Sequence, residues 1–279
     1  EVVAVDLDGK RPQYLYGYKN FKLSSKGDRY GDDKGSGHIA NIPFRDNHVQ
    51  LSTYLWDSDR SFLYDVDSVS STRKLLAEIG ARRLTFHSQR DGMPRFATGT
   101  DEEYNWVAYR RDDSAGKWNE LSKEITGKFY RPLAFTADNS ELFAFFSAKG
   151  EPTTLVRESL ATGKREILAQ DKLNSLGILW NEKDLSPFGV VTNIGIPRVR
   201  YLDENAPNAK LHKTLSQQFP GSMVNFESYT DDGNKLLFKV SSDRDPGAYY
   251  LYDRRAGTAD LLFAVSADID PDQMSEQRP

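Results

Sequence analysis

Short apolar, β-prone runs alternate along this chain with short turns rich in Asp, Asn, Ser and Gly. Two of the clearest copies are Phe-Thr-Ala-Asp-Asn-Ser-Glu-Leu-Phe at residues 135–143 and Tyr-Thr-Asp-Asp-Gly-Asn-Lys-Leu-Leu-Phe at residues 229–238. Asp and Asn side chains hydrogen-bond the backbone of such turns, and Gly adopts a positive φ there without steric cost. The pattern therefore predicts hairpins, with an extended strand on each side of every polar turn.

The polar turns recur at a nearly constant spacing. Five turn aspartates stand 45 to 48 residues apart: Asp46, Asp91, Asp138, Asp184 and Asp232. A series of glycines runs in phase with them, at steps of 47 and 94 residues: Gly116, Gly163 and Gly257. Self-similarity with a period of about 40–50 residues is typical of β-propellers, in which one four-stranded unit is repeated.

Each repeat has room for four antiparallel strands. The strand after the turn aspartate is expected at residues 48–56, 93–99, 141–148, 187–193 and 235–242. A third strand is expected at residues 62–65, 106–109, 154–157, 199–203 and 249–253, and the fourth is clearest at residues 165–170 and 259–265. The sequence thus predicts an all-β fold, an incomplete β-propeller of about five full four-stranded blades plus part of another. The blades are assigned to residues 40–80, 81–125, 126–170, 174–219 and 222–265, within a propeller fragment that spans residues 1–265.

Two segments before the first full repeat depart from the pattern. Residues 1–18 match the outer hairpin of a blade whose inner half is absent, so the chain is expected to begin within a blade. Residues 20–40, which are rich in Gly, Asp and Ser, are expected to form an insertion between blades.

The fourth repeat also departs from the pattern. Where a glycine hairpin is expected, Leu211, Leu215 and Phe219 follow one another at intervals of four residues. That spacing favours a short amphipathic helix. Residues 206–219 are therefore predicted to contain the one substantial helix of the chain, ended by the Pro-Gly pair that follows.

Composition narrows the classes of function. The chain has 279 residues, of which 38% are hydrophobic and 28% are charged, as in soluble globular proteins. No apolar run approaches the ~18 residues that a membrane span needs. The net charge of −4 gives no basic field for nucleic acid. The absence of cysteine excludes disulfides, thiol catalysis and cysteine metal sites, and leaves the redox compartment open.

The chain lacks the motifs of common hydrolases. No Gly-x-Ser-x-Gly string occurs, so the nucleophile elbow of α/β-hydrolases is missing. The four histidines, His38, His48, His87 and His212, lack the His-Glu-x-x-His spacing, and scattered histidines in a β domain are usually structural. Asp-Asp-Gly-Asn at residues 231–234 covers only part of a calcium loop and fits a hairpin turn. The sequence predicts no catalytic residue, no metal ligand and no cofactor.

One pair of carboxylates is a candidate for substrate binding. Glu102 and Glu103 precede Tyr104 in a predicted loop between strands. An acidic pair on a propeller can hold the amino terminus of a peptide through charge-assisted hydrogen bonds. The alternative is that both are ordinary solvated loop residues, since surface acids are common. The abundant aromatic residues fit packing between blades first and ligand stacking second.

The last repeat resembles a known family. Ser-Ser-Asp-Arg-Asp-Pro-Gly-Ala-Tyr-Tyr-Leu-Tyr-Asp at residues 241–253, followed by Ala-Gly-Thr and Leu-Leu-Phe, resembles the final propeller blade of bacterial prolyl oligopeptidase-family serine peptidases, in their acylaminoacyl- and dipeptidyl-peptidase-like branch. The tail at residues 268–279 resembles the linker from that propeller into the catalytic domain. Residues 181–219 are similar to a helix-bearing blade of the same branch.

In that family a seven-bladed propeller caps an α/β-hydrolase domain, whose Ser-Asp-His triad cleaves short peptides. The resemblance implies that this chain is the substrate-gating, non-catalytic propeller portion of such a peptidase and is inactive by itself. Residues 266–279 are then expected to be the linker toward a catalytic domain, and roughly one and a half blades are expected to precede the chain. No catalytic residue of the family has a matching position in this sequence.

Two other classes of protein are alternatives. A stand-alone propeller could bind a protein or glycan partner, although it has no reason to carry the linker-like tail. A propeller enzyme such as a glycosidase or lyase needs convergent carboxylates or metal ligands near its axis. The repeated aspartates cannot serve there, because they occupy turns in every repeat.

The sequence and the resemblance also set expectations about partners and location. The expected partners are a peptide substrate, reached through the hydrolase domain, and a second copy of the chain at the open side of an incomplete propeller. Neither nucleic acid nor a membrane is expected. The resemblance implies a periplasmic or secreted location, with the cytoplasm as the alternative.

Overall fold

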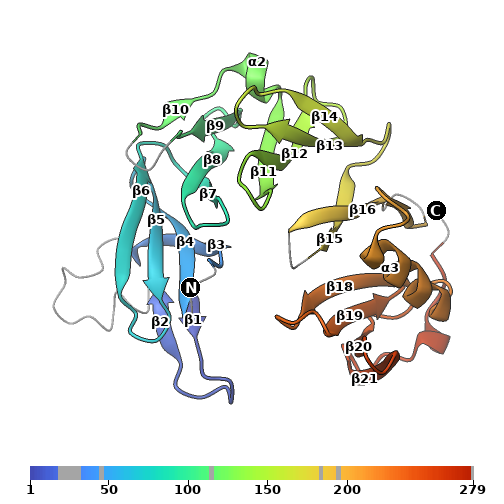
Figure 1. The fold of residues 1–279 in the computed structure, drawn as a ribbon. Helices are drawn as coiled ribbons and strands as arrows, with labels where there is room; N and C mark the ends of the chain where they lie inside the picture. Colours follow the sequence, from blue (N-terminus) through green and yellow to red (C-terminus); the bar gives the residue numbers. More distant parts are fainter. Residues whose placement is uncertain (18–32, 44–46, 113–115, 182–184, 193–195, 278–279) are drawn as a thin grey trace. The chain divides into compact units, whose positions relative to one another are not determined.

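The computed structural model describes residues 1–17, 33–43, 47–112, 116–181, 185–192 and 196–277 (Figure 1). The chain divides into two compact units. The first comprises Glu1–Glu151 and Glu158–Lys164, and the second comprises Pro152–Arg157 and Arg165–Pro279.

Five antiparallel sheets follow one another along the chain, and in each of them neighbouring strands are consecutive in sequence. The first sheet contains β3 (Gly35–Asn41), β4 (His48–Leu55), β5 (Ser61–Asp67) and β6 (Arg73–Ile79). The second contains β7 (Thr85–Ser88), β8 (Pro94–Thr100), β9 (Trp106–Arg110) and β10 (Asn119–Glu120), and the short helix α2 (Lys123–Thr126) follows it. The third contains β11 (Phe129–Phe135), β12 (Glu141–Ser147), β13 (Thr154–Ser159) and β14 (Arg165–Ala169).

The last two sheets lie on either side of a helix in the sequence. The fourth contains β15 (Leu176–Asn181), β16 (Ser186–Thr192) and β17 (Arg198–Tyr201), and α3 (Pro207–Gln218) comes after it. The fifth contains β18 (Met223–Tyr229), β19 (Lys235–Ser241), β20 (Ala248–Asp253) and β21 (Thr258–Ala264), and a 3₁₀ turn, η2 (Pro271–Gln273), follows.

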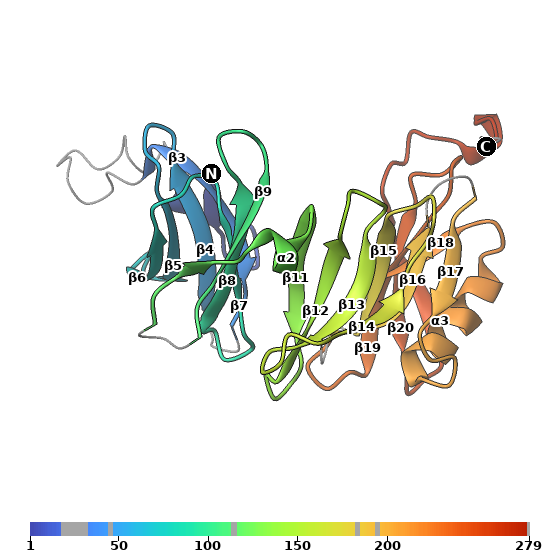
Figure 2. The same cartoon turned by 90° about the horizontal axis from the view of Figure 1, so that it is seen from above.

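The fold class predicted from the repeat is confirmed. The chain is mostly β and has a five-bladed propeller arrangement of blade-type sheets, four of which have four strands. In the described residues the fourth sheet has three strands. The predicted helix at residues 206–219 is α3, which packs against β16 and β18 (Figure 2). Its Leu215 joins Val224, Leu236 and Phe238 in a buried cluster.

The turn aspartates lie where the repeat places them. Asp91, Asp138 and Asp232 occupy the turns β7–β8, β11–β12 and β18–β19. Each accepts a hydrogen bond from the backbone N–H two residues ahead, at 2.9, 3.1 and 3.0 Å. Asp46 and Asp184, for which the same turn position is predicted, lie outside the described residues.

Residues 35–41 correct the sequence analysis. The sequence predicts an insertion that runs to residue 40, but residues 35–41 form β3, the first strand of the first sheet. The misleading signal is the Gly-Ser-Gly at its start. A Cβ on Gly37 would lie 2.7 Å from the ring of Tyr16, so these glycines allow the close approach of another strand rather than a loop.

The strand that approaches β3 belongs to an N-terminal hairpin. The predicted hairpin in residues 1–18 is a separate two-stranded sheet of β1 (Val2–Ala4) and β2 (Gln13–Tyr16). Its Leu15 and Tyr16 are buried against Leu51 and Phe62 of the first sheet.

A buried ion pair fixes this hairpin to the first sheet. The guanidinium of Arg73, on β6, pairs with Asp33 and also donates to the carbonyl oxygen of Leu15. The side chains of Arg73 and Asp33 are 9% and 0% exposed. Arg73 also lies over the ring of Tyr16, 5.2 Å from its centroid. One arginine thus joins the hairpin, the segment before β3 and the last strand of the sheet.

Candidate functional site

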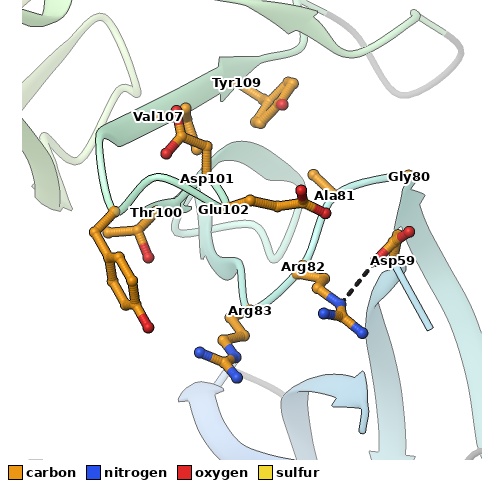
Figure 3. A pocket seen from close by; sticks show the side chains of 11 residues that line it. Asp59, Gly80, Ala81, Arg82, Arg83, Thr100, Asp101, Glu102, Val107 and Tyr109 are labelled. Carbon is orange, nitrogen blue, oxygen red and sulfur yellow. Dashed lines mark ion pairs between the residues drawn. The ribbon is translucent and has the colours of Figure 1, made fainter. Parts of the chain in front are cut away.

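A pocket of about 580 Å³ opens in the first unit, at the end of the sheets opposite the turn that holds Asp91. Because successive strands alternate in direction, the β4–β5 turn, the β6–β7 connection and the β8–β9 turn meet at this end. The lining residues come from these three segments and from β9: Asp59, Gly80, Ala81, Arg82, Arg83, Thr100, Asp101, Glu102, Tyr104, Val107 and Tyr109 (Figure 3).

The β6–β7 connection supplies two arginines with different roles. The Nε of Arg82 pairs with the Oδ1 of Asp59 at 2.7 Å and donates to the carbonyl oxygen of Ser58 at 3.3 Å. Arg83 has a φ of 56° and an exposed side chain that pairs with no described residue. Its guanidinium is therefore available to a ligand.

The β8–β9 turn is organised around Asp101. Its Oδ1 accepts hydrogen bonds from the backbone N–H groups of Glu103 at 2.9 Å and Asn105 at 2.8 Å. Desolvation raises the pKa of Asp101, but these bonds and the Asn105 side chain outweigh it and leave the pKa below its usual range. Asp101 therefore stays ionised at neutral pH while it holds the turn.

The turn separates the two candidate glutamates. Glu102 lines the pocket beside Asp101 (Figure 3). Glu103 is not part of the lining, and its Oε2 accepts a hydrogen bond from the Nδ2 of Asn105 at 3.3 Å. The acidic pair at the pocket is thus Asp101 and Glu102, with Glu103 inside the turn.

Tyr104 is the most exposed aromatic residue of this site. It has a φ of 63°, which is uncommon for a bulky residue, and it is 80% exposed. It borders the pocket and also a second hollow of about 310 Å³, which Trp106, Lys123 and Lys128 help to line. Arg83 and Tyr104 both carry a left-handed backbone at one pocket, and such strain clusters at ligand-binding sites.

The far wall of the pocket is half-buried. Val107 and Tyr109 come from β9, and the hydroxyl of Tyr109 donates to Glu120 at 3.3 Å. Desolvation, followed by the Glu120 carboxylate, raises the pKa of Tyr109. This phenol therefore stays neutral and serves as an apolar and hydrogen-bonding surface.

The site can bind a ligand, but its lining holds no nucleophile with an adjacent base. Thr100 supplies the one aliphatic hydroxyl, and no histidine, lysine or serine is among the described lining residues. Asp101 and Glu102 lie on one segment and the guanidinium of Arg83 on another, while Asp59 is paired with Arg82, so the pocket suits a small molecule with charges of both signs.

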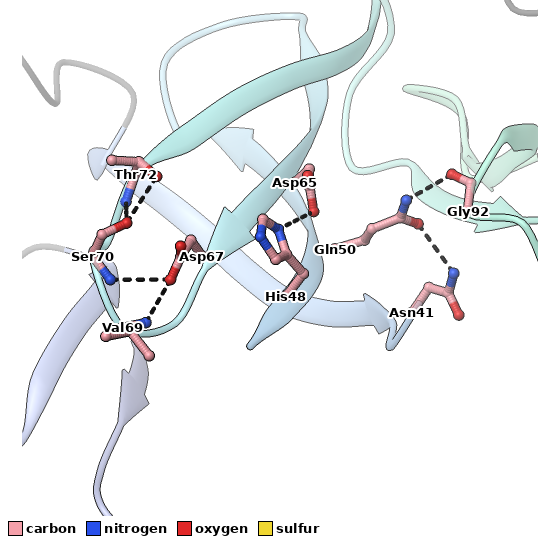
Figure 4. Close-up of polar contacts among 9 residues, drawn as sticks. All are labelled: Asn41, His48, Gln50, Asp65, Asp67, Val69, Ser70, Thr72 and Gly92. Carbon is pink, nitrogen blue, oxygen red and sulfur yellow. Dashed lines mark hydrogen bonds and ion pairs between the residues drawn. The ribbon is translucent and has the colours of Figure 1, made fainter. Parts of the chain in front are cut away.

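Three of the four histidines take part in internal hydrogen bonds. The Nδ1 of His48 lies 3.0 Å from the Oδ1 of Asp65, and both side chains are largely buried (Figure 4). The Nε2 of His87 lies 2.8 Å from the hydroxyl of Thr98, and burial lowers its pKa to about 3. His212 contacts the hydroxyl of Tyr201 and the carbonyl oxygen of Val224.

Nearby polar contacts join the first two sheets. Gln50 donates to the carbonyl oxygen of Gly92 at 2.7 Å, and its own oxygen accepts from Asn41 (Figure 4). Asp67 accepts from the backbone of Val69 and Ser70 in the β5–β6 turn.

The described residues contain no group of three or more metal-ligating side chains placed to hold an ion. None of their helices has the length and apolarity to cross a membrane.

Comparisons with known proteins show the fold. No family model matches the sequence, and no curated protein matches it. A puromycin-hydrolyzing peptidase of Mycobacterium tuberculosis superposes with a TM-score of 0.53 at 10% identity, over 94% of this chain and 42% of that chain. One of two prolyl endopeptidases superposes with a TM-score of 0.50 at 12% identity, over 88% of this chain and 45% of that chain. TolB from Acinetobacter baumannii superposes with a TM-score of 0.41 at 12% identity, over 95% of this chain and 49% of that chain.

This chain spans less than half the length of each of these three proteins. It has a β-propeller fold similar to those of the prolyl endopeptidase and the puromycin-hydrolyzing peptidase.

Sequence reasoning missed most of the pocket. It selected Glu102 but not Arg83, because the segments that carry them lie about 20 residues apart and only the folded sheets bring them together. The Arg82-Arg83 pair, just after the predicted blade at residues 40–80, is the one local signal that could have pointed there.

Proposed function

We propose that this chain is the substrate-gating propeller portion of an exported prolyl oligopeptidase-family serine peptidase that cleaves short peptides, and that it is inactive by itself. The observation that carries the proposal is a peptide-sized pocket, charged at both poles and without a nucleophile, on a propeller fold similar to that of such peptidases. The resemblance of residues 241–279 to the last blade and linker of that family supports the same conclusion.

The C-terminal segment is hydrogen-bonded to the last sheet, which fits the role of a linker. The guanidinium of Arg244, in the β19–β20 turn, donates from Nε and a terminal nitrogen to the carbonyl oxygen of Pro271, at 3.0 and 2.7 Å. The backbone N–H of Gln277 donates to Asp243. A segment fixed to the last sheet would transmit the position of the propeller to whatever follows it.

The proposed division of labour between a gating propeller and a catalytic domain has a physical reason. A catalytic serine open to water would attack exposed loops of folded proteins, whereas a rigid propeller admits only small peptides. Within this proposal Asp101 and Glu102 would receive the amino group of a short peptide, and Arg83 its carboxylate. The face of Tyr104 would contact an apolar side chain between them.

Peptide binding tests the proposal. Isothermal titration of this chain with an unblocked tripeptide should give weak, measurable binding, and the Glu102→Gln and Arg83→Gln variants should each weaken it about 5- to 20-fold, as expected for the loss of one charge-assisted contact. Glu227→Gln, an exposed position on β18, is the matched control. Equal binding by all variants, or no preference for the unblocked over the amidated and acetylated peptide, would contradict the proposal.

A binding module for a protein or glycan is the second candidate function. The exposed Tyr104 between two hollows favours it, since sugar rings and loop side chains stack on such aromatics. Titration with neutral oligosaccharides distinguishes the two candidates. Binding that depends on Tyr104 but not on Glu102 or Arg83 would favour the module.

A further inference from the structure

A second hollow of about 310 Å³ lies in the first unit, beside the pocket described above, and Tyr104 borders both of them. Its other lining residues come from the β8–β9 turn and the start of β9, from α2 and the turn after it, and from the end of β12: Asn105, Trp106, Lys123, Gly127, Lys128 and Ala148. No carboxylate is among these described residues, so the charge of the second hollow is positive. The acids Asp101 and Glu102 line the first pocket instead.

A tight turn after α2 brings the two lysines to one place. The backbone N–H of Gly127, which has a φ of 57°, donates to the carbonyl oxygen of Lys123 at 2.8 Å. A Cβ on Gly127 would lie 2.5 Å from the carbonyl oxygen of Ser147, so the turn requires glycine. The backbone N–H of Lys128 donates to that same carbonyl oxygen at 2.9 Å. The turn is thereby fixed to the end of β12, and Lys123 and Lys128 line one hollow.

Both ammonium groups have hydrogens left to donate. The Nζ of Lys123 donates one to the carbonyl oxygen of Trp106, which leaves two. The side chain of Lys128 is exposed and pairs with no described residue. The carboxylate of Asp101, in the neighbouring turn, accepts hydrogen bonds from the backbone and side chain of Asn105. The hollow therefore offers two cations that an anion can bridge.

One wall of the hollow is aromatic and fixed in place. The Nε1–H of Trp106 donates to the carbonyl oxygen of Tyr130 at 2.6 Å, and the ring packs against Phe129 with centroids 4.4 Å apart. Trp106 is half-buried, and the polar atom of its indole is already satisfied, so the remaining ring surface favours apolar groups. A ligand that suits this hollow thus has a short apolar stem that ends in an anion.

We propose that the second hollow binds the side-chain carboxylate of an acidic residue in the same peptide whose amino group lies at Asp101 and Glu102. This inference rests on the proposed function and adds a substrate class to it, namely short peptides with an acidic residue close to the amino terminus. Tyr104 borders both hollows, and an extended chain advances about 3.5 Å per residue. A glutamate at the second or third position would therefore reach past the ring of Tyr104.

A blocked glutamate tests the hollow by itself. N-acetyl-glutamate amide carries the side-chain carboxylate but no amino group, so its binding does not need Asp101 or Glu102. In NMR titrations it should shift the backbone amide signals of Gly127 and Lys128, and N-acetyl-glutamine amide should not. Lys128→Gln should weaken this binding about 5- to 10-fold, because it removes one charge-assisted contact. Lys164→Gln is the matched control, since Lys164 is an exposed lysine of the same unit outside the lining.

Peptide selectivity tests the link to the proposed function. Ala-Glu-Ala and Ala-Ala-Glu, each with a free amino group and an amidated carboxyl end, are compared with their glutamine counterparts by isothermal titration. At least one glutamate peptide should bind about 5- to 10-fold more tightly than its counterpart, and Lys128→Gln should abolish that preference without weakening the glutamine peptide.

Two results would overturn the inference. One is the absence of a shift at Gly127 and Lys128 with the blocked glutamate, and the other is glutamate peptides that bind no more tightly than glutamine peptides. Failure of the proposed function gives a different result. The blocked glutamate would still shift the signals of Gly127 and Lys128, but Glu102→Gln would leave the affinity of every unblocked peptide unchanged.

Discussion

At the residue scale, Arg73 connects three separate segments of the first unit. It joins β6, the segment that holds Asp33, and the carbonyl oxygen of Leu15 in the N-terminal hairpin. Both charges are buried, so each depends on the other to offset its lost hydration. A two-stranded sheet is marginal in water by itself, and this ion pair together with the burial of Tyr16 explains why β1 and β2 are ordered.

Removing one partner of this pair should be costly. Arg73→Met leaves Asp33 buried and unpaired, and we expect a loss of about 3–5 kcal/mol in the free energy of unfolding, measured by urea denaturation. Lys74→Met, at an exposed position on the same strand, should change stability by less than about 0.5 kcal/mol. The double variant Asp33→Leu, Arg73→Met should recover much of the loss. A single variant as stable as the wild type would show that the pair is not buried in solution.

At the scale of elements, the repeated hairpin turn is the unit of this fold. In the third and fifth sheets a threonine donates its hydroxyl hydrogen to the turn aspartate two residues later, Thr136 to Asp138 and Thr230 to Asp232. Hydrogen bonds from Thr136 and from the backbone and side chain of Ser140 lower the pKa of Asp138 from 3.8 to about 2. The same kind of bonds lower the pKa of Asp232.

The lowered pKa makes the turn sensitive to acid. Because the folded pKa of Asp138 lies below its unfolded value, its contribution to stability is complete above about pH 5 and is lost as the pH falls toward 2. We expect Asp138→Ala to lower the melting temperature at pH 7, and the difference from wild type to shrink between pH 5 and pH 2. Glu227→Ala at an exposed site is the control. A difference that stays constant over this range would contradict the assignment.

At the scale of the whole molecule, the chain is a series of blade-type sheets. Several of its described hydroxyls and histidines take part in turns and internal hydrogen bonds, as with His48 and Asp65 or His87 and Thr98. The described pocket lacks a nucleophile.

The chain alone should therefore not hydrolyse peptides. We expect no release of fluorophore from short peptide amides and no labelling by a serine-directed fluorophosphonate, because the sequence contains no nucleophile elbow. An active prolyl peptidase assayed in parallel shows that the assay detects turnover. Activity that persists through purification and disappears with the phosphonate would refute this prediction.

The sequence predicted the sheets well because their signal is local. The alternation of apolar runs and polar turns places the strands to within a few residues, and the spacing of Leu211, Leu215 and Phe219 locates α3. β3 was misread because its glycines are selected for contact with Tyr16, a residue about 20 positions earlier. A local pattern carries no information about that contact.

The pocket was beyond the sequence for a related physical reason. Glu102 could be chosen from its neighbours alone, but its position beside Asp101 and facing the segment of Arg83 depends on how two hairpin turns and the connection between two sheets meet. The sequence by itself determined the repeat, the turns and the helix, because these follow from interactions between residues close along the chain. Tertiary structure alone decided which charges share a pocket and which apolar side chains remain exposed, because both depend on contacts between residues far apart in sequence.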